Sequence, residues 1–418
     1  MNVKRTNIIL KPDSSKVILK PFEPGDKKRI TKIIDRISKL PEEEVLKGYK
    51  TVNDLYSSRH KKFEHLFLKR FEDVKKYYPG TESISKERML LIGSYFTNEY
   101  SLEHSALFNP SMVWHPDQSK LSEGKKRFII SLRATGEGHI SSIEFRSGTI
   151  DSESNIELDG INRFVAMPEI SNLSDSTYEA HFDNEINLSE RVLFPQLLIE
   201  SNGIEDARFV RFEDENKKVI HYATYCAYDG HNITMRLLHT EDFQTFSSHQ
   251  LEGTEVQNKG MALFPRKING QYVMLSRQDN ENNYIMFSDK LLRWETKQLL
   301  MEPEYPWEFF QIGNCGSPIE TEKGWLCLSH GVGAARRYSI GAFLLDKNDP
   351  TKLIGRLKKP LLEADQNERE GYVPNVVYTC GGVINGKDLV FPYAMSDYAS
   401  SFASVNLNDL LEELTNGW

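Results

Sequence analysis

The sequence Glu205-Asp206-Ala207-Arg208 carries the most pointed chemical pattern in the chain. Two carboxylates stand beside a guanidinium, directly before the apolar run that starts at Phe209. A neighbouring arginine can hold a carboxylate ionised or tune its pKa, as a catalytic acid requires. Acids and bases also alternate on exposed strand edges, so this pattern alone leaves a catalytic and a structural interpretation open.

Two further segments place charged side chains beside turns. Glycines flank Glu137 in the run from Arg133 to His139, and a loop with few side chains can bring a carboxylate close to a ligand. Such turns also serve purely conformational needs. Lys259 and Arg277 flank an apolar hairpin, where they can form an anion site or can be ordinary solvated charges.

Later segments combine aromatic side chains with carboxylates, an amide and a histidine. A carbohydrate site requires this combination, because aromatic faces cover the C–H surfaces of a sugar while amides and carboxylates bind its hydroxyl groups. The residues of this kind after residue 300 are Trp307, Glu308, Trp325, His330, Glu368, Glu370, Tyr372 and Asn375. None of these signals is specific by itself.

Length and composition limit the class of protein. The chain has 418 residues, 39% hydrophobic and 27% charged, which excludes collagen-like, coiled-coil and broadly disordered classes. A net charge of −8 argues against a nucleic-acid or anionic-membrane partner. The sequence has no apolar leader and no run of about 18 apolar residues. We therefore expect a cytoplasmic protein, or a periplasmic one if a signal peptide has been removed.

The four cysteines are scattered along the chain without a Cys-x-x-Cys pair. They are Cys226, Cys315, Cys327 and Cys380. This spacing predicts reduced thiols and signals neither a disulfide framework nor a structural zinc site. We expect no metal and no cofactor in the site.

The pattern of apolar residues changes near residue 100. From residue 26 to 78, apolar residues recur at helical spacing in a highly charged sequence, which predicts two or three amphipathic helices. One helix is expected to start at Pro41, and Pro79-Gly80 is expected to end the last one. We expect residues 1–100 to form a helical extension that serves packing or oligomerisation.

After residue 100, short β-rich runs alternate with turn signals, and helical periodicity returns only from Leu407 to Leu414. Hairpin signals include residues 213–216, Asn269-Gly270 and residues 385–388. Units of roughly 50 to 60 residues recur loosely, which favours the blades of a propeller over a sandwich. The runs are 127–132, 140–145, 209–212, 219–225, 272–275, 284–287, 325–328, 340–345, 376–379 and 389–393.

Seven short motifs follow one another along this part of the chain. They are Asn109-Pro110-Ser111, Leu132-Arg133, Glu205-Asp206-Ala207-Arg208, Tyr228-Asp229-Gly230, Lys259 with Leu263-Phe264-Pro265, Gly324-Trp325-Leu326 with His330-Gly331, and Pro374-Asn375-Val376-Val377. In this order they resemble glycoside hydrolase family 130, which comprises inverting β-mannoside phosphorylases and β-1,2-mannosidases. The resemblance implies an all-β catalytic domain over residues 101–418, a five-bladed β-propeller, behind an α-helical N-terminal extension that carries no family chemistry.

The resemblance also implies roles for single residues. Asp206 matches the catalytic aspartate of the family, a general acid whose proton passes through a sugar hydroxyl in the phosphorylases. Asn109, Arg133 and Asp229 match positions that line the mannose subsite. The further candidates are Glu137, His139, Arg208, His330 and Asn375 for substrate binding, and Lys259 and Arg277 for an anion or phosphate.

The sequence departs from the family pattern at two positions. The proline of the signature is Ala207 here, which softens the local turn and leaves the acid in place. Phosphorylases usually carry His-Arg in their phosphate pocket, where this chain has Ser276-Arg277. Losing that histidine removes a hydrogen-bond donor to phosphate, which favours hydrolysis.

Hydrolysis with inversion needs a second carboxyl group about 6.5 to 9.5 Å from the acid, placed to activate a water. Added carboxylates near the mouth of the site, among them Glu368, would repel phosphate and can supply this base. We rank Glu308 and Glu370 nearly equal for this role, with Glu137 third.

Three functions of different classes follow. The first is an inverting β-mannosidase acting on β-1,2-linked manno-oligosaccharides, with Asp206 as general acid and a water activated by a glutamate. The second is a β-mannoside phosphorylase, with inorganic phosphate as co-substrate and mannose 1-phosphate as product, supported by Arg133, Lys259 and Arg277. The third is a binding protein, against which the retained Asp206 and Arg208 argue. The expected partner is an oligosaccharide, without nucleic acid or membrane, and a homo-oligomer is left open.

Overall fold

The computed structural model describes residues 1–78 and 84–416, and the chain divides into two compact units. The larger unit comprises Met1–Asp13, Glu103–Ile161 and Met167–Trp418, and the smaller one comprises Ser14–Leu102 and Asn162–Ala166. The helix end expected at Pro79-Gly80 lies outside the described residues.

The smaller unit contains the helices that the sequence predicts. They are α1 (Lys27–Ser38), α2 (Glu42–Tyr56) and α3 (Phe63–Val74), followed by the short 3-10 turn η1 (Lys75–Tyr77). As predicted, α2 begins directly after Pro41, with three glutamates in its first turn at the positive end of the helix dipole. The apolar faces of these helices meet around Ile34, Val45 and Phe71.

Two features of this unit were not predicted. They are the helix α4 (Lys86–Tyr95) and the two-stranded ribbon of β2 (Val17–Pro21) and β3 (Thr97–Ser101). Gly93 of α4 lies so close to α3 that a Cβ there would stand 1.9 Å from the carbonyl oxygen of Phe67. Residues on several sides of α4 are buried, so its sequence lacks the polar stripe by which an amphipathic helix is detected. No described helix is long and apolar enough to cross a membrane.

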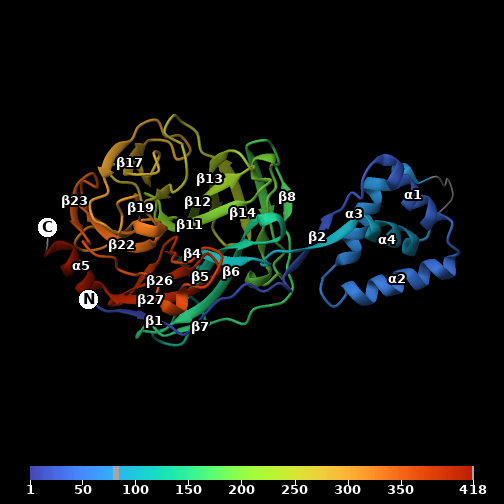
Figure 1. Ribbon diagram of the computed structural model, residues 1–418, viewed down its shortest axis with the longest axis horizontal. Coiled ribbons are helices and arrows are strands. Elements are labelled where there is room, and N and C mark those ends of the chain that lie inside the picture. The colour runs from blue at the N-terminus through green and yellow to red at the C-terminus, as the bar shows by residue number, and fades with distance from the viewer. Residues whose placement is uncertain (79–83, 417–418) are drawn as a thin grey trace. The chain divides into compact units, whose positions relative to one another are not determined.

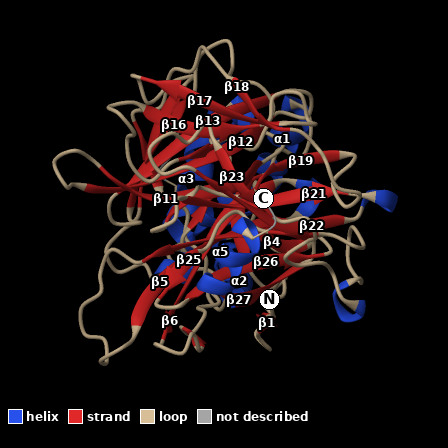
Figure 2. Ribbon diagram, turned by 90° about the vertical axis from the view of Figure 1, so that its left-hand side faces the viewer, coloured by secondary structure: helices blue, strands red, loops and turns tan. Residues whose placement is uncertain are grey.

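The larger unit is built of five antiparallel sheets, each named here after one of its edge strands (Figures 1 and 2). The β4 sheet contains β4 (Ala106–Trp114), β5 (Lys126–Thr135), β6 (Ser141–Ile150), β7 (Ile156–Leu158) and β10 (Val192–Leu193). The β11 sheet contains β8 (Glu169–Ser171), β9 (Thr177–His181), β11 (Ile204–Glu213), β12 (Val219–Tyr228), β13 (Ile233–Thr240) and β14 (Thr245–Gln250). The β15 sheet contains β15 (Ala262–Leu263), β16 (Tyr272–Ser276), β17 (Asn283–Ser288) and β18 (Gln298–Met301).

The last two sheets complete the unit. The β19 sheet contains β19 (Gln311–Asn314), β20 (Ile319–Glu320), β21 (Trp325–Val332), β22 (Tyr338–Leu345) and β23 (Leu353–Arg356). The β24 sheet contains β24 (Val377–Tyr378), β25 (Val383–Asn385), β26 (Asp388–Met395), β27 (Ala399–Asn406) and β1 (Val3–Arg5). The remaining elements are η2 (Glu137–His139), η3 (Leu188–Glu190), η4 (Leu198–Glu200), η5 (Ala334–Arg336), η6 (Gln366–Glu368) and α5 (Leu407–Thr415).

The predicted β-rich class is confirmed, since every predicted run falls on a strand and α5 covers the predicted C-terminal helix. Many strands were missed, among them β4, which contains Asn109 and Pro110 and therefore lacks a continuous β signal. The predicted helical extension of residues 1–100 includes β1, which instead pairs with β27 through Val3 and Val405.

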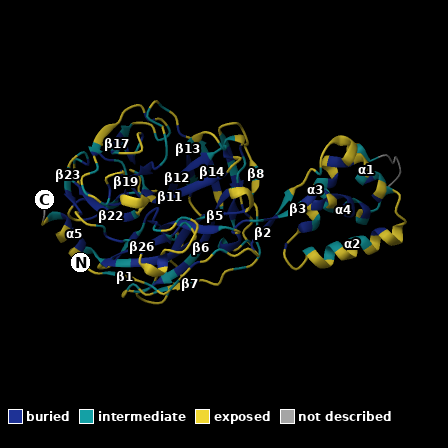
Figure 3. Cartoon of the chain, viewed as in Figure 1, coloured by how far each residue is buried: buried dark blue, intermediate teal, exposed yellow. Residues whose placement is uncertain are grey.

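Five buried apolar clusters join the five sheets in a circuit. They lie between the β4 and β11 sheets, the β11 and β15 sheets, the β15 and β19 sheets, the β19 and β24 sheets, and the β24 and β4 sheets. Figure 3 shows the strands as the buried part of the unit and the loops as its exposed part. Each sheet therefore packs against two others.

Candidate active site

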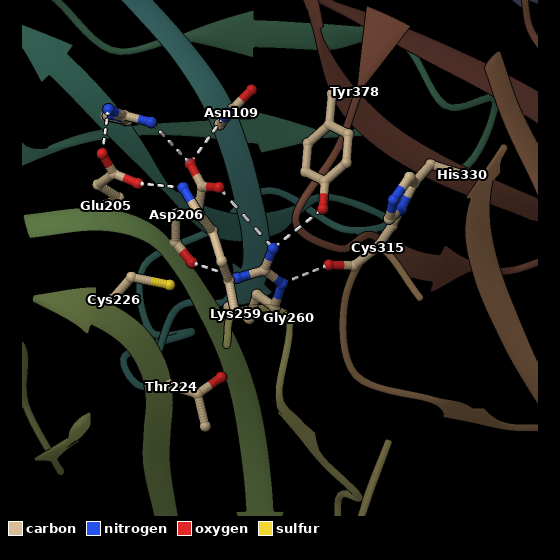
Figure 4. Close-up of polar contacts among 12 residues, drawn as sticks. Asn109, Glu205, Asp206, Thr224, Cys226, Lys259, Gly260, Cys315, His330 and Tyr378 are labelled. Carbon is tan, nitrogen blue, oxygen red and sulfur yellow. Dashed lines mark hydrogen bonds and ion pairs between the residues drawn. The ribbon is translucent and has the colours of Figure 1, made fainter. Parts of the chain in front are cut away.

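Asn109 and Asp206 lie at matching irregularities of two sheets. The register of β4 against β5 shifts around Asn109, and that of β11 against β12 shifts around Asp206. In both bulges the backbone is left-handed, with φ of 47° at Asn109 and 52° at Asp206. A bulge re-aims a side chain relative to the strand, and here Asn109 Nδ2 donates to Asp206 Oδ1 at 2.7 Å (Figure 4).

Cationic side chains surround the two acids at the start of β11. Glu205 pairs with Arg133 at 2.6 Å and with Lys259 at 3.0 Å, and Arg133 also lies 3.5 Å from Asp206. Burial opposes the ionisation of Asp206, but the cations Arg133, Arg208 and Lys259 hold its pKa below the ordinary value. The Asp206 carboxyl is therefore ionised at neutral pH in this arrangement.

Arg208 holds the start of β11 in place. It is fully buried, and its Nε donates to the carbonyl oxygen of Cys315 at 2.8 Å. Its two terminal nitrogens donate to the Tyr378 hydroxyl and to the backbone carbonyl of Asp206, each at 2.9 Å (Figure 4). These bonds tie three sheets together. Arg208, which was expected to bind substrate, therefore has the contacts of a positioning residue.

Arg277 is the least compensated cation of the site. Its side chain lies over Gly260 and Gly313, where an added Cβ would come within 2.8 Å and 2.9 Å of it. Its Nε is buried without a hydrogen-bond partner among the described residues. The preceding Ser276 is buried, and its hydroxyl donates to Gln278 at 3.1 Å. With its Nε unpaired and no ion pair to a described carboxylate, Arg277 keeps a charge that can attract an anion.

His330 is fully buried beside Arg277. Burial first, and then the charges of Arg277 and Arg208, keep the pKa of His330 well below its ordinary value, so the ring is neutral. Its Nε2 lies 3.4 Å from the side-chain amide of Gln311, and its Nδ1 has no partner among the described residues. His330 therefore adds a hydrogen-bonding group to the site and no charge.

The predicted bases have other surroundings. The Glu308 side chain is 0% exposed, and one of its oxygens pairs with Arg356 and accepts two backbone N–H groups of its own loop. Glu370 is exposed on a loop, and Glu137 is exposed at the start of η2. No hydrogen bond or ion pair between described residues joins Glu308 or Glu370 to Asp206. Their role as base stays a prediction that this geometry does not favour.

Three other predicted residues lie on loops or turns. Asp229 stands in the turn between β12 and β13, where two backbone N–H groups of the same turn lower its pKa to about 2. His139 ends η2, with its ring 5.7 Å from that of Tyr372. Asn375 precedes β24, with φ of 64°. Their contacts with a substrate stay predictions.

Asp397 interacts electrostatically with Asp206 and Arg133, and the sequence did not single it out. It stands in the turn between β26 and β27, with φ of 48°. Burial raises its pKa to about 6, and the Asp206 carboxylate adds to the rise, while Arg133 and Arg336 oppose it. An acid in a hairpin turn is ordinary in sequence, so only the fold brings Asp397 to Asp206.

The site has neither a cluster of metal ligands nor a reactive thiol among the described residues. The described ranges contain no group of three or more His, Cys, Asp or Glu side chains that could hold a metal ion. All four cysteines are free and buried. Burial raises the pKa of Cys226 to about 11, so this thiol, although close to Glu205 and Asp206, is not a nucleophile at neutral pH.

Comparison with known proteins agrees with the motifs. The family model described as β-1,4-mannooligosaccharide phosphorylase of glycoside hydrolase family 130 matches residues 165–416. A β-1,2-mannobiose phosphorylase of Thermoanaerobacter sp. is 31% identical over 68% of this chain and 85% of its own length. A 1,2-β-oligomannan phosphorylase of the same organism is 32% identical over 54% of this chain and 76% of its own length.

Solved structures share the fold. The β-1,2-mannobiose phosphorylase of Listeria innocua, in complex with β-1,2-mannobiose, has a TM-score of 0.54 at 21% identity, over 75% of this chain and 93% of its own. A structure described under family 130 hydrolases that target β-1,2 mannosidic linkages also has a TM-score of 0.54, at 19% identity, over 74% and 87%. With the family model matching more than half of its length, the chain belongs to glycoside hydrolase family 130 and is an enzyme, a glycoside hydrolase or a closely related phosphorylase.

Proposed function

We propose that this protein is an inverting β-mannoside phosphorylase, which cleaves β-1,2-linked manno-oligosaccharides with inorganic phosphate and releases α-mannose 1-phosphate. The observation that carries the proposal is the surplus of cations around Asp206. Three carboxyl groups, those of Glu205, Asp206 and Asp397, face four cations. The cations are Arg133, Lys259, Arg277 and the buried Arg208. Arg277 lacks a counter-charge among the described residues. Such a site favours a dianion over a water molecule as the second reactant.

Asp206 is the proposed general acid. A phosphate oxygen attacks the anomeric carbon while the bond to the leaving oxygen breaks, and that oxygen takes the electron pair and a proton derived from Asp206. Because nearby cations depress the pKa of Asp206, a bound phosphate that compensates them would raise it and favour the protonated acid. Phosphate binding would thus prepare the acid for catalysis.

The relatives support the same choice. The two Thermoanaerobacter proteins are both named as phosphorylases of β-1,2-linked mannosides. The backbone does not separate the two reactions, because a phosphorylase and a structure described under hydrolases match with the same TM-score. Ser276 in place of a histidine, together with the added carboxylates, favours hydrolysis in the sequence, whereas the unpaired Arg277 and the enclosed Glu308 favour phosphorolysis.

Hydrolysis is the second candidate, supported by two observations. Ser276 stands where phosphorylases usually have a histidine, and its buried hydroxyl is bound to Gln278. Asp397 interacts with Asp206 and has a pKa of about 6, which suits a base that activates water. In that case Asp397 takes the role predicted for Glu308 or Glu370.

The larger unit is proposed to be a five-bladed propeller that forms the catalytic domain. The closed circuit of five sheets and five apolar clusters supports this architecture. A cavity of about 440 Å³ supports it too, because it is lined by strand residues of four sheets, Val113, Val210, Ile319 and Val383 among them, and by Pro265, which closely follows β15. The smaller helical unit is proposed to serve packing or oligomerisation.

The test is incubation of the protein with β-1,2-mannobiose in the presence and absence of inorganic phosphate. Mannose 1-phosphate that forms only with phosphate is the expected result. Free mannose formed at the same rate without phosphate would show that the protein is a hydrolase and not a phosphorylase. The α configuration of the first product, read by nuclear magnetic resonance, checks inversion.

A further inference from the structure

Phe309 and Phe310 are two consecutive aromatic residues with exposed rings. They are 62% and 73% exposed, and they directly precede β19. A single exposed apolar residue needs no explanation, but two exposed phenyl side chains in succession place two apolar rings in water on one loop. Neither ring packs against another aromatic ring among the described residues. This differs from Tyr372, whose ring lies 5.7 Å from that of His139.

The loop that carries these rings is firmly held, so their exposure is not the result of a loose chain. The Glu308 carboxylate is buried against Arg356 and accepts the N–H groups of Glu304 and Tyr305 at 2.9 Å and 3.1 Å. The Phe310 N–H donates to the Val332 carbonyl at 3.0 Å. The backbone that carries both rings is therefore held in place.

The Trp307 ring packs the same loop against β21 and β22. It fills the space over Gly331 and Gly341, where an added Cβ would come within 2.4 Å and 2.5 Å of it. Gly333, which begins the turn between β21 and β22, lies against the Trp307 backbone, since its Cβ would stand 3.0 Å from the Trp307 carbonyl oxygen. One aromatic side chain of this loop is thus used for packing, and the next two point away.

The two phenylalanines adjoin the site around Asp206. The next residue, Gln311, reaches His330, whose pKa is shifted by Arg277, Arg208 and Asp206. The turn beside Trp307 contains Arg336, which interacts with Asp397. Phe309 and Phe310 therefore lie at the end of the strands where Asp206 is found.

We propose that Phe309 and Phe310 form a binding platform for the sugar units of longer β-mannosides, beyond the mannosyl unit cleaved at Asp206. This proposal rests on the proposed function and adds to it a preference for longer substrates. Asp206 is only 8% exposed, so the terminal mannosyl unit must enter a confined space while the rest of the chain leads outward. Flat phenyl faces bind the C–H surfaces of such sugar rings.

An oligosaccharide fits this surface better than a protein does. Two rings form a small patch, whereas a specific protein interface buries about 1,200 Å² or more in total. The neighbouring Glu302, Glu304 and Arg336 are exposed and polar. Apolar faces beside charged groups match the alternating C–H and hydroxyl surfaces of a sugar chain.

The test compares a disaccharide with a longer chain. We expect the double variant Phe309→Ala/Phe310→Ala to lower the ratio of kcat/KM for β-1,2-mannotetraose to kcat/KM for β-1,2-mannobiose by about tenfold, which corresponds to about 1.4 kcal/mol of lost stacking. Phe310→Trp should keep the ratio. Leu299→Ala, which truncates another exposed apolar residue (46%) in the same unit, is the matched control and should also keep it. An unchanged ratio in the double variant would overturn the platform.

A binding measurement separates this inference from the proposed function. Saturation-transfer nuclear magnetic resonance with β-1,2-mannotetraose is applied to Asp206→Asn, with and without the two alanines. Loss of the tetraose signal on adding the alanines supports the platform even if the wild-type protein turns over no mannoside, a result that would reject the proposed function alone. An equal signal in both proteins rejects the platform, whatever the reaction is.

Discussion

Two buried carboxylates of the larger unit, Asp206 and Glu308, have contrasting surroundings. Glu308 is fully enclosed, meets one cation, Arg356, and accepts two N–H groups of its own loop. Asp206 keeps 8% exposure, sits on a left-handed bulge and is surrounded by more cations than it can neutralise. The first arrangement is enclosed and paired with one cation, as in a structural ion pair, although Oε2 of Glu308 has no hydrogen-bond partner among the described residues. The second arrangement has positive charge without a counter-charge and a strained backbone, as is typical of a site that binds a ligand.

The strongest test of this contrast is Asp206→Asn. We expect kcat to fall by about a thousandfold, because the amide cannot transfer a proton, within the range of 10² to 10⁴ usual for a lost general acid. Release of mannose 1-phosphate from β-1,2-mannobiose measures the effect, with circular dichroism to verify folding. Activity within tenfold of the wild type would show that Asp206 is not the acid.

Glu308→Gln should have the opposite profile. Removing the charge of Glu308 leaves Arg356 with only the partly exposed Glu304 as its ion-pair partner, so we expect the free energy of unfolding to fall by about 3 kcal/mol. The kcat of the folded fraction should stay within about threefold, because the Glu308 side chain is inaccessible to water. Urea denaturation and kcat on the same preparation measure both quantities. A thousandfold loss of kcat at unchanged stability would instead make Glu308 the catalytic base.

This contrast also explains what the sequence could predict. Local signals were sufficient for the start of α2 after Pro41 and for the ten β-rich runs, because proline geometry and residue alternation act within a few residues. The acid at Asp206 was found through a motif. The strand of Asn109 was missed because the bulge that makes Asn109 useful interrupts the β pattern.

The partners of the carboxylates could not be predicted, because they depend on the packing of distant sheets. Glu308 and Arg356 are 48 residues apart, and nothing near Glu308 in sequence indicates that it is neutralised. Asp397 reaches Asp206 only because the last hairpin turn of the β24 sheet returns to the start of β11. The predicted bases were therefore Glu308 and Glu370, and Asp397 was not among the candidates.

Asp397→Asn tests the surroundings of Asp206 through the pH dependence of the free energy of unfolding. The folded protein holds the pKa of Asp397 at about 6, above its ordinary value of 3.8, so this group stabilises the fold at low pH and loses that contribution as pH rises through 6. Asparagine does not titrate. From pH 4.5 to pH 7.5, the free energy of unfolding of the wild type should therefore fall relative to Asp397→Asn by about 2 kcal/mol. Urea denaturation at both pH values measures this, and a pH-independent difference would contradict the environment described for Asp397.

Arg277→Ala is the mildest test and the one most specific to phosphate. Loss of one partly buried cation that lacks a counter-charge should raise the KM for phosphate about tenfold, or 1.4 kcal/mol, and leave the KM for the mannoside within about twofold. Arg266→Ala is the matched control, since Arg266 makes a double hydrogen bond with Glu320, at 2.9 Å for both contacts, and should leave the phosphate KM unchanged. If both variants changed the phosphate KM equally, the effect would come from general charge, and the distinction between an uncompensated and a paired arginine would be lost. If neither changed it, phosphate would bind away from Arg277, and the surplus of cations around Asp206 would require another explanation.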